Sequence, residues 1–289
     1  MITTDELRKT LGPLGIWMYS PASAGLDPES YARQVEAAGF TSVWIPAVNS
    51  AADLAAVEPM LAATRQLVLG TGISSVWTWQ AAELAADCQR LESLYPGRFV
   101  LGLGVSHAPL VEATGQAYVR PYTKMVGYLD ELGDLPVPVV LAALGPKMLE
   151  LSRDRAAGAH PYFTPPAHTA RARQILGAAP LLIPEIAVAL AAGDAGADHA
   201  KDYAQRYLQL PNYTNNLRRL GYAEADVTGG GSVRLLSDVV PHGMADVQAR
   251  IAGHLRAGAD HVVIQLLGEG GRLAPGDLAA LAELTSALR

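Results

Sequence analysis

Short apolar segments alternate with helical segments along almost the whole chain, and this alternation limits the possible folds more than any other feature. Eight segments have the length and the aliphatic, β-branched or aromatic content of buried strands. Strands that are apolar throughout, with helices between them, are typical of a parallel sheet covered on both faces. The predicted strands are Leu14–Tyr19, Thr41–Pro46, Leu67–Ile73, a strand within Arg98–Pro109, Val137–Ala142, Gly158–Phe163, Pro180–Leu190 and Asp260–Leu267.

Between these strands lie residues that are typical of the first and last turns of helices. Asp27-Pro28 is a typical N-cap with proline in the first turn, and Gly39 ends the helix that follows. The predicted helices are Glu29–Ala38, Ala51–Thr64, Gln80–Leu94, Tyr122–Leu132, Pro146–Ala156, a helix from Thr164-Pro165-Pro166 to Leu176, Asp194–Leu210, Pro211–Leu220, Val233–Val240, Met244–Ala257 and Pro275–Leu288.

Eight strand–helix units predict an α/β fold, a (β/α)8 TIM barrel with a helical insertion between strands seven and eight. The 289 residues are enough for one such barrel, so residues 1–289 are predicted to form a single domain. A doubly wound sheet is the alternative. Neither a G-x-G-x-x-G motif after the first strand nor a G-x-x-x-x-G-K-[ST] motif is present to favour it.

Composition excludes several classes of protein. The net charge is −6 and no basic stripe is present, so nucleic acid is not an expected partner. The longest apolar run is much shorter than the roughly 20 residues of a membrane span, and the polar N-terminus is no signal peptide. Cys88 is the single cysteine, which rules out an internal disulfide and fits the reducing cytoplasm.

The stretch Arg98–Pro109, RFVLGLGVSHAP, carries the first functional signal. Gly102 and Gly104 lie within a predicted strand, where the absence of a Cβ lets a bulky group approach the backbone. Ser106 and His107 follow at the C-terminal end of that strand. Ligands bind at this end in parallel α/β proteins, so the sequence predicts a site here.

Four segments together resemble a known family. They are FVLGLGVSHAP, VVLAALGPKMLELS, GAHPYFTPPAHTARARQILG and LPNYTNNLRRLGY. In this order they are similar to the bacterial luciferase-like monooxygenase superfamily, and most similar to its branch of oxidoreductases dependent on coenzyme F420, an 8-hydroxy-5-deazaflavin. The resemblance implies a TIM-like barrel, hydride transfer between the cofactor C5 and a small organic substrate, and a homodimer.

The resemblance also implies cofactor-binding residues. In the family, a non-prolyl cis peptide at the end of the third strand lies behind the central ring of the cofactor, and Gly72-Ile73 occupies that place. A strand end that turns into a helix holds the phosphate of the cofactor through backbone amides, which a helix N-terminus favours. The positions that match the family's cofactor contacts are Gly72, Ile73, Ser74, Ser75, Ala143, Leu144, Gly145 and Tyr162, with Phe163 and Thr164 beside the last.

Two residues of the phosphate segment lead to opposite expectations. Lys147 is expected to add only a peripheral charge, so its removal should weaken cofactor binding by less than about tenfold. Gly145→Val is expected to crowd the phosphate and distort the turn.

His107 is the candidate catalytic residue. It aligns with a position that carries an acidic glutamate in some sugar-phosphate relatives, and an imidazole can donate or accept a proton near neutral pH. Trp17, Tyr19, Trp77 and Trp79 lie at or just after strand ends and are predicted to line an apolar substrate pocket. Residues of the insertion are expected to overhang the mouth of the barrel. They are Asn212, Tyr213, Asn215 and Asn216.

One position departs from the family pattern. Ala47 stands where relatives commonly carry an acidic residue, and an alanine side chain can neither transfer a proton nor accept a hydrogen bond. Two alternatives therefore stay open beside a deazaflavin-dependent oxidoreductase. The first is an FMN-dependent monooxygenase of the same superfamily, and the second is a degenerate barrel that binds a cofactor or ligand without turnover. No metal site is predicted, and the substrate is not specified by the sequence.

Overall fold

The computed structural model describes residues 2–19, 27–47, 54–268 and 276–287. Within them, nine parallel strands form one sheet in the order β7-β6-β5-β4-β3-β2-β1-β9-β8. Neighbouring strands follow the chain order without a reversal, which excludes the doubly wound alternative and confirms the predicted barrel fold. The strands are β1 (Leu14–Trp17), β2 (Ser42–Ala47), β3 (Val68–Ser75), β4 (Phe99–Gly104), β5 (Val139–Leu141), β6 (Gly158–Ala159), β7 (Leu181–Leu182), β8 (Glu185–Ala189) and β9 (Val262–Leu267).

The prediction of one continuous seventh strand over Pro180–Leu190 is wrong, because the segment divides at Pro184 into β7 and β8. Proline has no N–H to donate to a strand ladder. β7 pairs with β6, while β8 pairs with β9. The Ile183 N–H bonds to the Ala159 carbonyl on one side, and the Val263 N–H bonds to the Pro184 carbonyl on the other, each at 2.9 Å. This broken strand therefore closes the sheet into a barrel.

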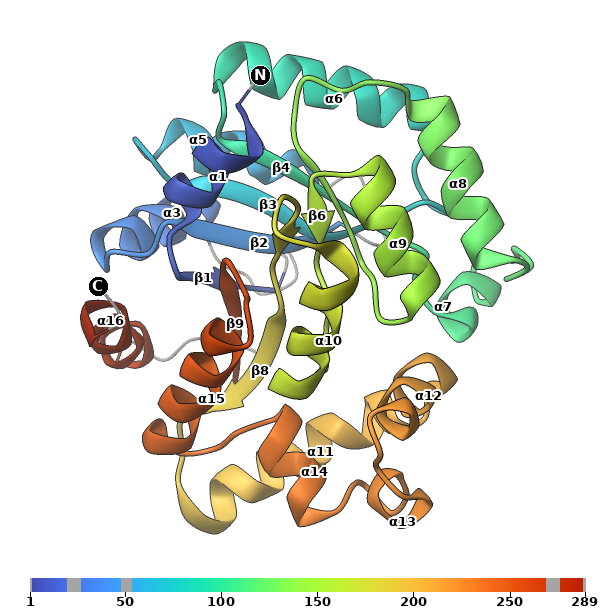
Figure 1. Cartoon of the computed structure of the whole chain (residues 1–289). Helices are drawn as coiled ribbons and strands as arrows, with labels where there is room; N and C mark the ends of the chain where they lie inside the picture. The colour runs from blue at the N-terminus through green and yellow to red at the C-terminus, as the bar shows by residue number, and fades with distance from the viewer. Residues whose placement is uncertain (1, 20–26, 48–53, 269–275, 288–289) are drawn as a thin grey trace.

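Helices surround the barrel, and α11 to α14 gather as a group at the bottom of Figure 1. Helices α11 to α15 all lie between β8 and β9 in the sequence, where the insertion is predicted. The helices are α1 (Thr4–Leu11), α3 (Pro28–Ala37), α5 (Val57–Ala62), α6 (Ala81–Leu94), α7 (Ala108–Glu112), α8 (Pro121–Leu132), α9 (Pro146–Arg155), α10 (Pro166–Leu176), α11 (Gly193–Leu208), α12 (Pro211–Arg219), α13 (Glu224–Val227), α14 (Val233–Val239), α15 (Met244–Arg256) and α16 (Asp277–Ala287). The predicted helix Ala51–Thr64 begins outside the described residues. Both ends of the predicted helix Pro275–Leu288 lie outside them.

Helix α1 is absent from the sequence prediction. Its start carries a recognisable signal, since Thr3 and Glu6 form a reciprocal capping box. Leu7 and Leu11 of α1 belong to one buried cluster with residues from six strands, among them Trp44 and Val263. The helix therefore closes one end of the barrel with apolar side chains.

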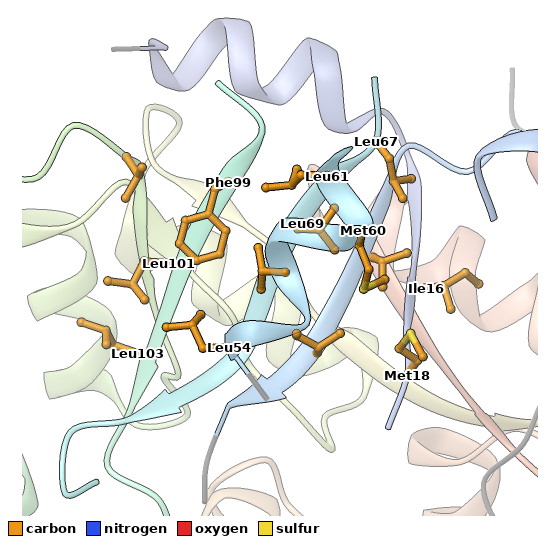
Figure 2. Packing of buried hydrophobic residues seen from close by; sticks show 14 of the residues in the cluster. Ile16, Met18, Leu54, Met60, Leu61, Leu67, Leu69, Phe99, Leu101 and Leu103 are labelled. Carbon is orange, nitrogen blue, oxygen red and sulfur yellow. The ribbon is translucent and has the colours of Figure 1, made fainter. Parts of the chain in front are cut away.

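A second, larger layer of the core lies between the strands and the surrounding helices. Figure 2 shows part of it, where Met60 and Leu61 of α5 approach Leu69 of β3 and Phe99 of β4. No helix in the part of the chain that the structure describes is both long and apolar enough to cross a membrane.

Candidate functional site

A cavity of about 860 Å³ lies at the carboxyl ends of the barrel strands. This is the end at which barrels of this type bind ligands, and the volume is typical of a site for a small molecule or cofactor. Leu110 and Tyr122 line the cavity and are 49% and 42% exposed, so the cavity opens to solvent beside them.

The central wall of the cavity is formed by Gly72 and Ile73, and the peptide bond between them is cis, as the resemblance implies. The Trp17 indole N–H donates to the Gly72 carbonyl oxygen at 3.0 Å. The glycines of β4 let this wall lie close. A Cβ on Gly102 would lie 1.8 Å from the Thr71 carbonyl oxygen, and one on Gly104 would lie 2.7 Å from Ile73.

One end of the cavity is formed by the turn from β5 into α9, residues Ala143–Lys147, which we call the anion turn. Gly145 is the N-cap of α9 and Pro146 begins the helix. Within the described chain, the backbone N–H groups of Leu144 and Gly145 have no acceptor in the protein. Free N–H groups at a helix N-terminus favour a bound anion.

His168 of α10 fixes the orientation of this turn. Its Nε2 lies 2.9 Å from the Leu144 carbonyl oxygen, which can only accept, so Nε2 carries the proton. The C=O and N–H of one trans peptide point in opposite directions, so the Gly145 N–H points away from His168. The pKa of His168 is lowered to about 4, mainly by burial and also by Arg219 and Arg171, while the hydrogen bond to Leu144 opposes the shift.

Positive charge lies beside the anion turn. The Arg219 guanidinium lies 3.7 Å from the place that a Cβ on Gly145 would occupy, and both residues line the cavity. Lys147 lines the same end and is exposed. The turn therefore combines backbone donors with two cationic side chains.

The floor of the cavity holds a buried carboxyl and a buried imidazole, Glu185 and His160, which we call the floor pair. Glu185 begins β8, and His160 directly follows β6. The Glu185 Oε2 lies 3.4 Å from His160 Nε2, and their side chains are only 6% and 2% exposed. The Trp44 ring stacks on the imidazole at 4.7 Å between centroids. Burial raises the pKa of Glu185, and His160 partly offsets this.

Tyr207 and Tyr213 of the insertion, and Tyr162 after β6, line the cavity together with the floor pair. Gln265 of β9 accepts hydrogen bonds from Tyr162, at 2.7 Å, and from Tyr203. Tyr203 lies 3.1 Å from the hydroxyl of Tyr207, and the Tyr207 ring stacks on Phe163 at 5.2 Å. Burial raises the pKa of Tyr207 to about 12, so its hydroxyl keeps its proton at neutral pH.

His107 lines the cavity after β4. Its Nε2 lies 3.5 Å from the Tyr213 hydroxyl, and its Nδ1 is buried without a hydrogen-bond partner among the described residues. Burial lowers the pKa of His107, and a hydrogen bond with Asn212 opposes this shift. The imidazole is therefore mainly neutral at pH 7.

The structure brings together most of the residues that the sequence predicts for the site, but not all. Those that line the cavity are His107, Gly72, Ile73, Ala143, Leu144, Gly145, Tyr162 and Trp17. Those that lie outside its lining are Ser74, Ser75, Tyr19, Trp77 and Trp79.

The residues outside the lining have contacts of their own. The Ser75 hydroxyl accepts a hydrogen bond from the Trp77 backbone, and the Trp77 indole donates to the Val105 carbonyl at 2.9 Å. Tyr19 packs edge-on against Trp17 at 4.9 Å, and Trp79 packs against the outer core layer.

The sequence reasoning misses Glu185, His160, Gln265, Arg206 and Arg219, all of which line the cavity. A signal for two of them is present. Glu185 in LLIPEIAVAL and Gln265 in HVVIQLL are single polar residues within apolar strands, and such residues are rarely buried without a partner or a function.

No group of three or more His, Cys, Asp and Glu side chains with metal-binding geometry occurs among the described residues. Ala47 ends β2, where its strand pairs with Ser74. The Ala47 side chain has no group that can transfer a proton, whereas the floor pair supplies a carboxyl from β8.

Comparison with known proteins supports the sequence resemblance. The family model of luciferase-like monooxygenases matches residues 27–135. A 5,10-methylenetetrahydromethanopterin reductase of Methanolobus tindarius is 28% identical over 166 residues, which are 48% of this chain and 51% of that protein. The chain thus spans about half the length of this curated relative.

Solved structures match nearly the whole chain. An F420-dependent secondary alcohol dehydrogenase in complex with an F420-acetone adduct has a TM-score of 0.74 at 15% identity, covering 96% of this chain and 99% of that one. A coenzyme F420 dependent tetrahydromethanopterin reductase from Methanopyrus kandleri has a TM-score of 0.71 at 15% identity, covering 94% and 96%. At this level of identity the likeness establishes the fold.

Proposed function

We propose that the chain is a luciferase-like protein and a coenzyme F420-dependent oxidoreductase, a proposal supported by the family match over residues 27–135 and by the fold. The names of the similar proteins support this cofactor. When bound, a deazaflavin supplies or accepts a hydride for a small organic substrate.

The observation that carries the proposal is the pairing of two chemically different regions in one cavity. The anion turn offers free backbone N–H groups, Arg219 and Lys147, which suit a phosphate. Among the described residues, a Cβ on Gly145 would meet only Arg219, at 3.7 Å, so the space beside Gly145 is open. The central wall, Gly72 and Ile73, and the stacked rings of Phe163 and Tyr207 suit a flat ring.

In this proposal the residues of the chain have separate tasks. Leu144 and Gly145 bind the phosphate, while Gly72 and Ile73 support the ring. The tyrosines and Phe163 exclude water from the reacting face. His107 holds or accepts a proton beside the substrate, and its lowered pKa suits a base better than an acid at neutral pH.

Fluorescence titration of the purified protein with F420 and with FMN tests the proposal. We expect F420 to bind more tightly than FMN, and its bound form to undergo reduction or oxidation with a small substrate. Binding of FMN alone would favour the FMN-dependent monooxygenase, and the description of the matched family supports the monooxygenase part of this alternative.

Binding of neither cofactor would favour the degenerate barrel, for which Ala47 is the motivating feature. We also propose a homodimer in the cytoplasm, acting on a small molecule without nucleic acid or membrane partners. Light scattering of the purified protein measures its oligomeric state, and a monomer at micromolar concentration would contradict the dimer.

A further inference from the structure

One hydrogen bond and one close contact of the floor pair limit the number of protons that it holds. His160 Nδ1 lies 2.7 Å from the Ile183 carbonyl oxygen. A carbonyl can only accept, so Nδ1 carries a proton. Nε2 makes no aligned hydrogen bond among the described residues, and Glu185 Oε2 lies 3.4 Å from it. At that distance a bare nitrogen beside a bare carboxylate would place two lone pairs near each other. One further proton therefore belongs between the two groups, on either the carboxyl or the imidazole.

The surroundings favour keeping this proton. Glu185 and His160 are both almost fully buried, and burial raises the pKa of Glu185. The ionisable groups that face Glu185 from the other packed elements are Tyr19, Tyr207 and Tyr213, with Arg206 beside them in the cavity lining.

His160 faces a second set of groups. Trp44 stacks on its ring, and His261 lies behind Trp44 as a further ionisable neighbour. Burial lowers the pKa of His261 to about 4, so His261 is neutral at pH 7 and does not supply the shared proton.

The shared proton lies beside the centre of the cavity. A Cβ on Gly72 would lie only 3.0 Å from His160 Nε2, so this nitrogen directly adjoins the central wall. Both members of the floor pair line the cavity, and the cavity reaches solvent past Leu110 and Tyr122. A proton lost from the floor pair can therefore be replaced from water.

We propose that Glu185 and His160 form one acid–base unit that holds a single exchangeable proton and delivers it to the heteroatom of a carbonyl or imine substrate. This inference rests on the proposed function for its hydride. When the substrate carbon of a C=O or C=N bond gains a hydride, the π electron pair moves to the heteroatom. That atom then takes the proton from the floor pair, which becomes a carboxylate and a neutral imidazole until water restores the proton.

The floor pair and His107 differ in their ability to donate a proton. His107 has a neighbouring hydroxyl but no carboxylate within ion-pair distance among the described residues, and its pKa is lowered by burial. The floor pair retains its proton because burial raises the pKa of Glu185, which faces a buried imidazole and not a solvent-exposed cation. The proton donor is therefore assigned to the floor and not to His107.

The first arm of the test uses the cofactor-free protein. Imidazole nitrogen NMR with ¹⁵N-labelled histidine, from pH 5 to 9, follows His160 in the wild type, in Glu185→Gln and in the exposed-site control Glu150→Gln. We expect Glu185→Gln to lower the pH at which His160 gains its second proton by at least one unit, a tenfold change in proton affinity, and the control to change nothing. An identical titration in Glu185→Gln and wild type would overturn the proposal.

The second arm uses the F420-loaded enzyme with a panel of short ketones, aldehydes and cyclic imines. We expect Glu185→Gln to lower kcat at least 100-fold and flatten its pH profile, with a change in F420 Kd below threefold. His107→Gln should lower kcat less. Unchanged kcat in Glu185→Gln overturns the proton transfer, and a panel without any substrate for the wild type overturns the substrate class.

Failure of the proposed function is distinguishable from these outcomes. If F420 does not bind the wild type, the proposed function fails, while the NMR arm still decides whether the floor pair shares one proton. If Glu185→Gln does not fold, the wild-type titration decides, because a shared proton requires His160 to titrate together with a carboxyl in a single coupled process.

Discussion

The two ends of the cavity are built in different ways. The anion turn is five consecutive residues, and its donors are backbone N–H groups that the start of α9 leaves free. The floor pair joins residues 25 positions apart, one after β6 and one at the start of β8, and its chemistry depends on two buried side chains, of which His160 stacks on Trp44. A site made of backbone donors tolerates the truncation of side chains around it, whereas a buried pair does not tolerate the loss of one partner.

The histidines of the molecule show the same contrast. The floor pair places its imidazole opposite a carboxyl. His168, behind the anion turn, bonds to a carbonyl, His254 bonds to the Thr169 hydroxyl, and His261 bonds to the Ser42 hydroxyl. A buried imidazole beside neutral partners loses its charge, and one beside a carboxyl can share a proton.

The largest expected effect is acid destabilisation through the three buried neutral histidines. Burial lowers the pKa of His168 and His261 to about 4 and that of His254 to about 3, against 6.5 when unfolded. Their contribution is complete above pH 6.5 and is lost as pH falls towards 4, because the unfolded chain then binds more protons. For each histidine, the free energy of unfolding falls by about 2 kcal/mol between pH 7 and pH 5.

Thermal unfolding from pH 8 to 4 measures this loss. The exposed His199 provides a matched control, and His199→Gln should leave the pH dependence unchanged. A melting temperature that stays constant from pH 7 to 5 would show that these histidines are accessible to protons in the folded protein.

Breaking the floor pair is the next largest effect. His160→Leu leaves Glu185 buried without its partner, which we expect to cost about 3 kcal/mol in the free energy of unfolding at pH 8. The double variant His160→Leu with Glu185→Leu should recover at least half of this loss, because no unpaired carboxyl remains. Urea unfolding measures both. A double variant as unstable as the single one would mean that the loss comes from packing against Trp44 and not from charge.

Gly145→Val tests the anion turn and should affect binding without affecting stability. The backbone at Gly145 has φ −90° and ψ 159°, which suits valine, so the expected distortion of the turn does not apply. An added side chain would instead fill the space beside Arg219. We expect the F420 Kd to rise at least 30-fold, or about 2 kcal/mol.

The control for this variant is a deazaflavin analogue without the phosphate, whose affinity should change much less, with the urea midpoint unchanged. Equal losses for both ligands would place the phosphate elsewhere in the cavity.

The smallest effect is expected for Lys147→Ala. Lys147 is exposed at the rim, and an exposed charge contributes on the order of 0–1 kcal/mol. The F420 Kd should therefore rise less than about tenfold at fixed salt. Arg219→Ala should weaken binding more, since the guanidinium lies beside Gly145. Loss of binding in Lys147→Ala, with little change in Arg219→Ala, would contradict this order.

Contiguous features of the site were predictable and scattered ones were not. The segment LGPK has the glycine, proline and strand–helix boundary of the anion turn within a few residues, and the resemblance placed Gly72-Ile73 correctly as a cis peptide. Glu185 was hidden inside a predicted apolar strand. Its partner His160 lies in a different segment, and the parallel bridge between Tyr162 and Glu185 brings the two segments together.

The sequence by itself determined the strand–helix alternation, the barrel and the end at which the cavity opens. These follow from hydrophobic period, capping and glycine content, which are local properties of the chain. The division of the seventh strand at Pro184, the closing helix α1 and the floor pair were decided by the tertiary structure. Burial gives a carboxyl and an imidazole one shared proton, and burial is a property of the closed barrel rather than of any one segment.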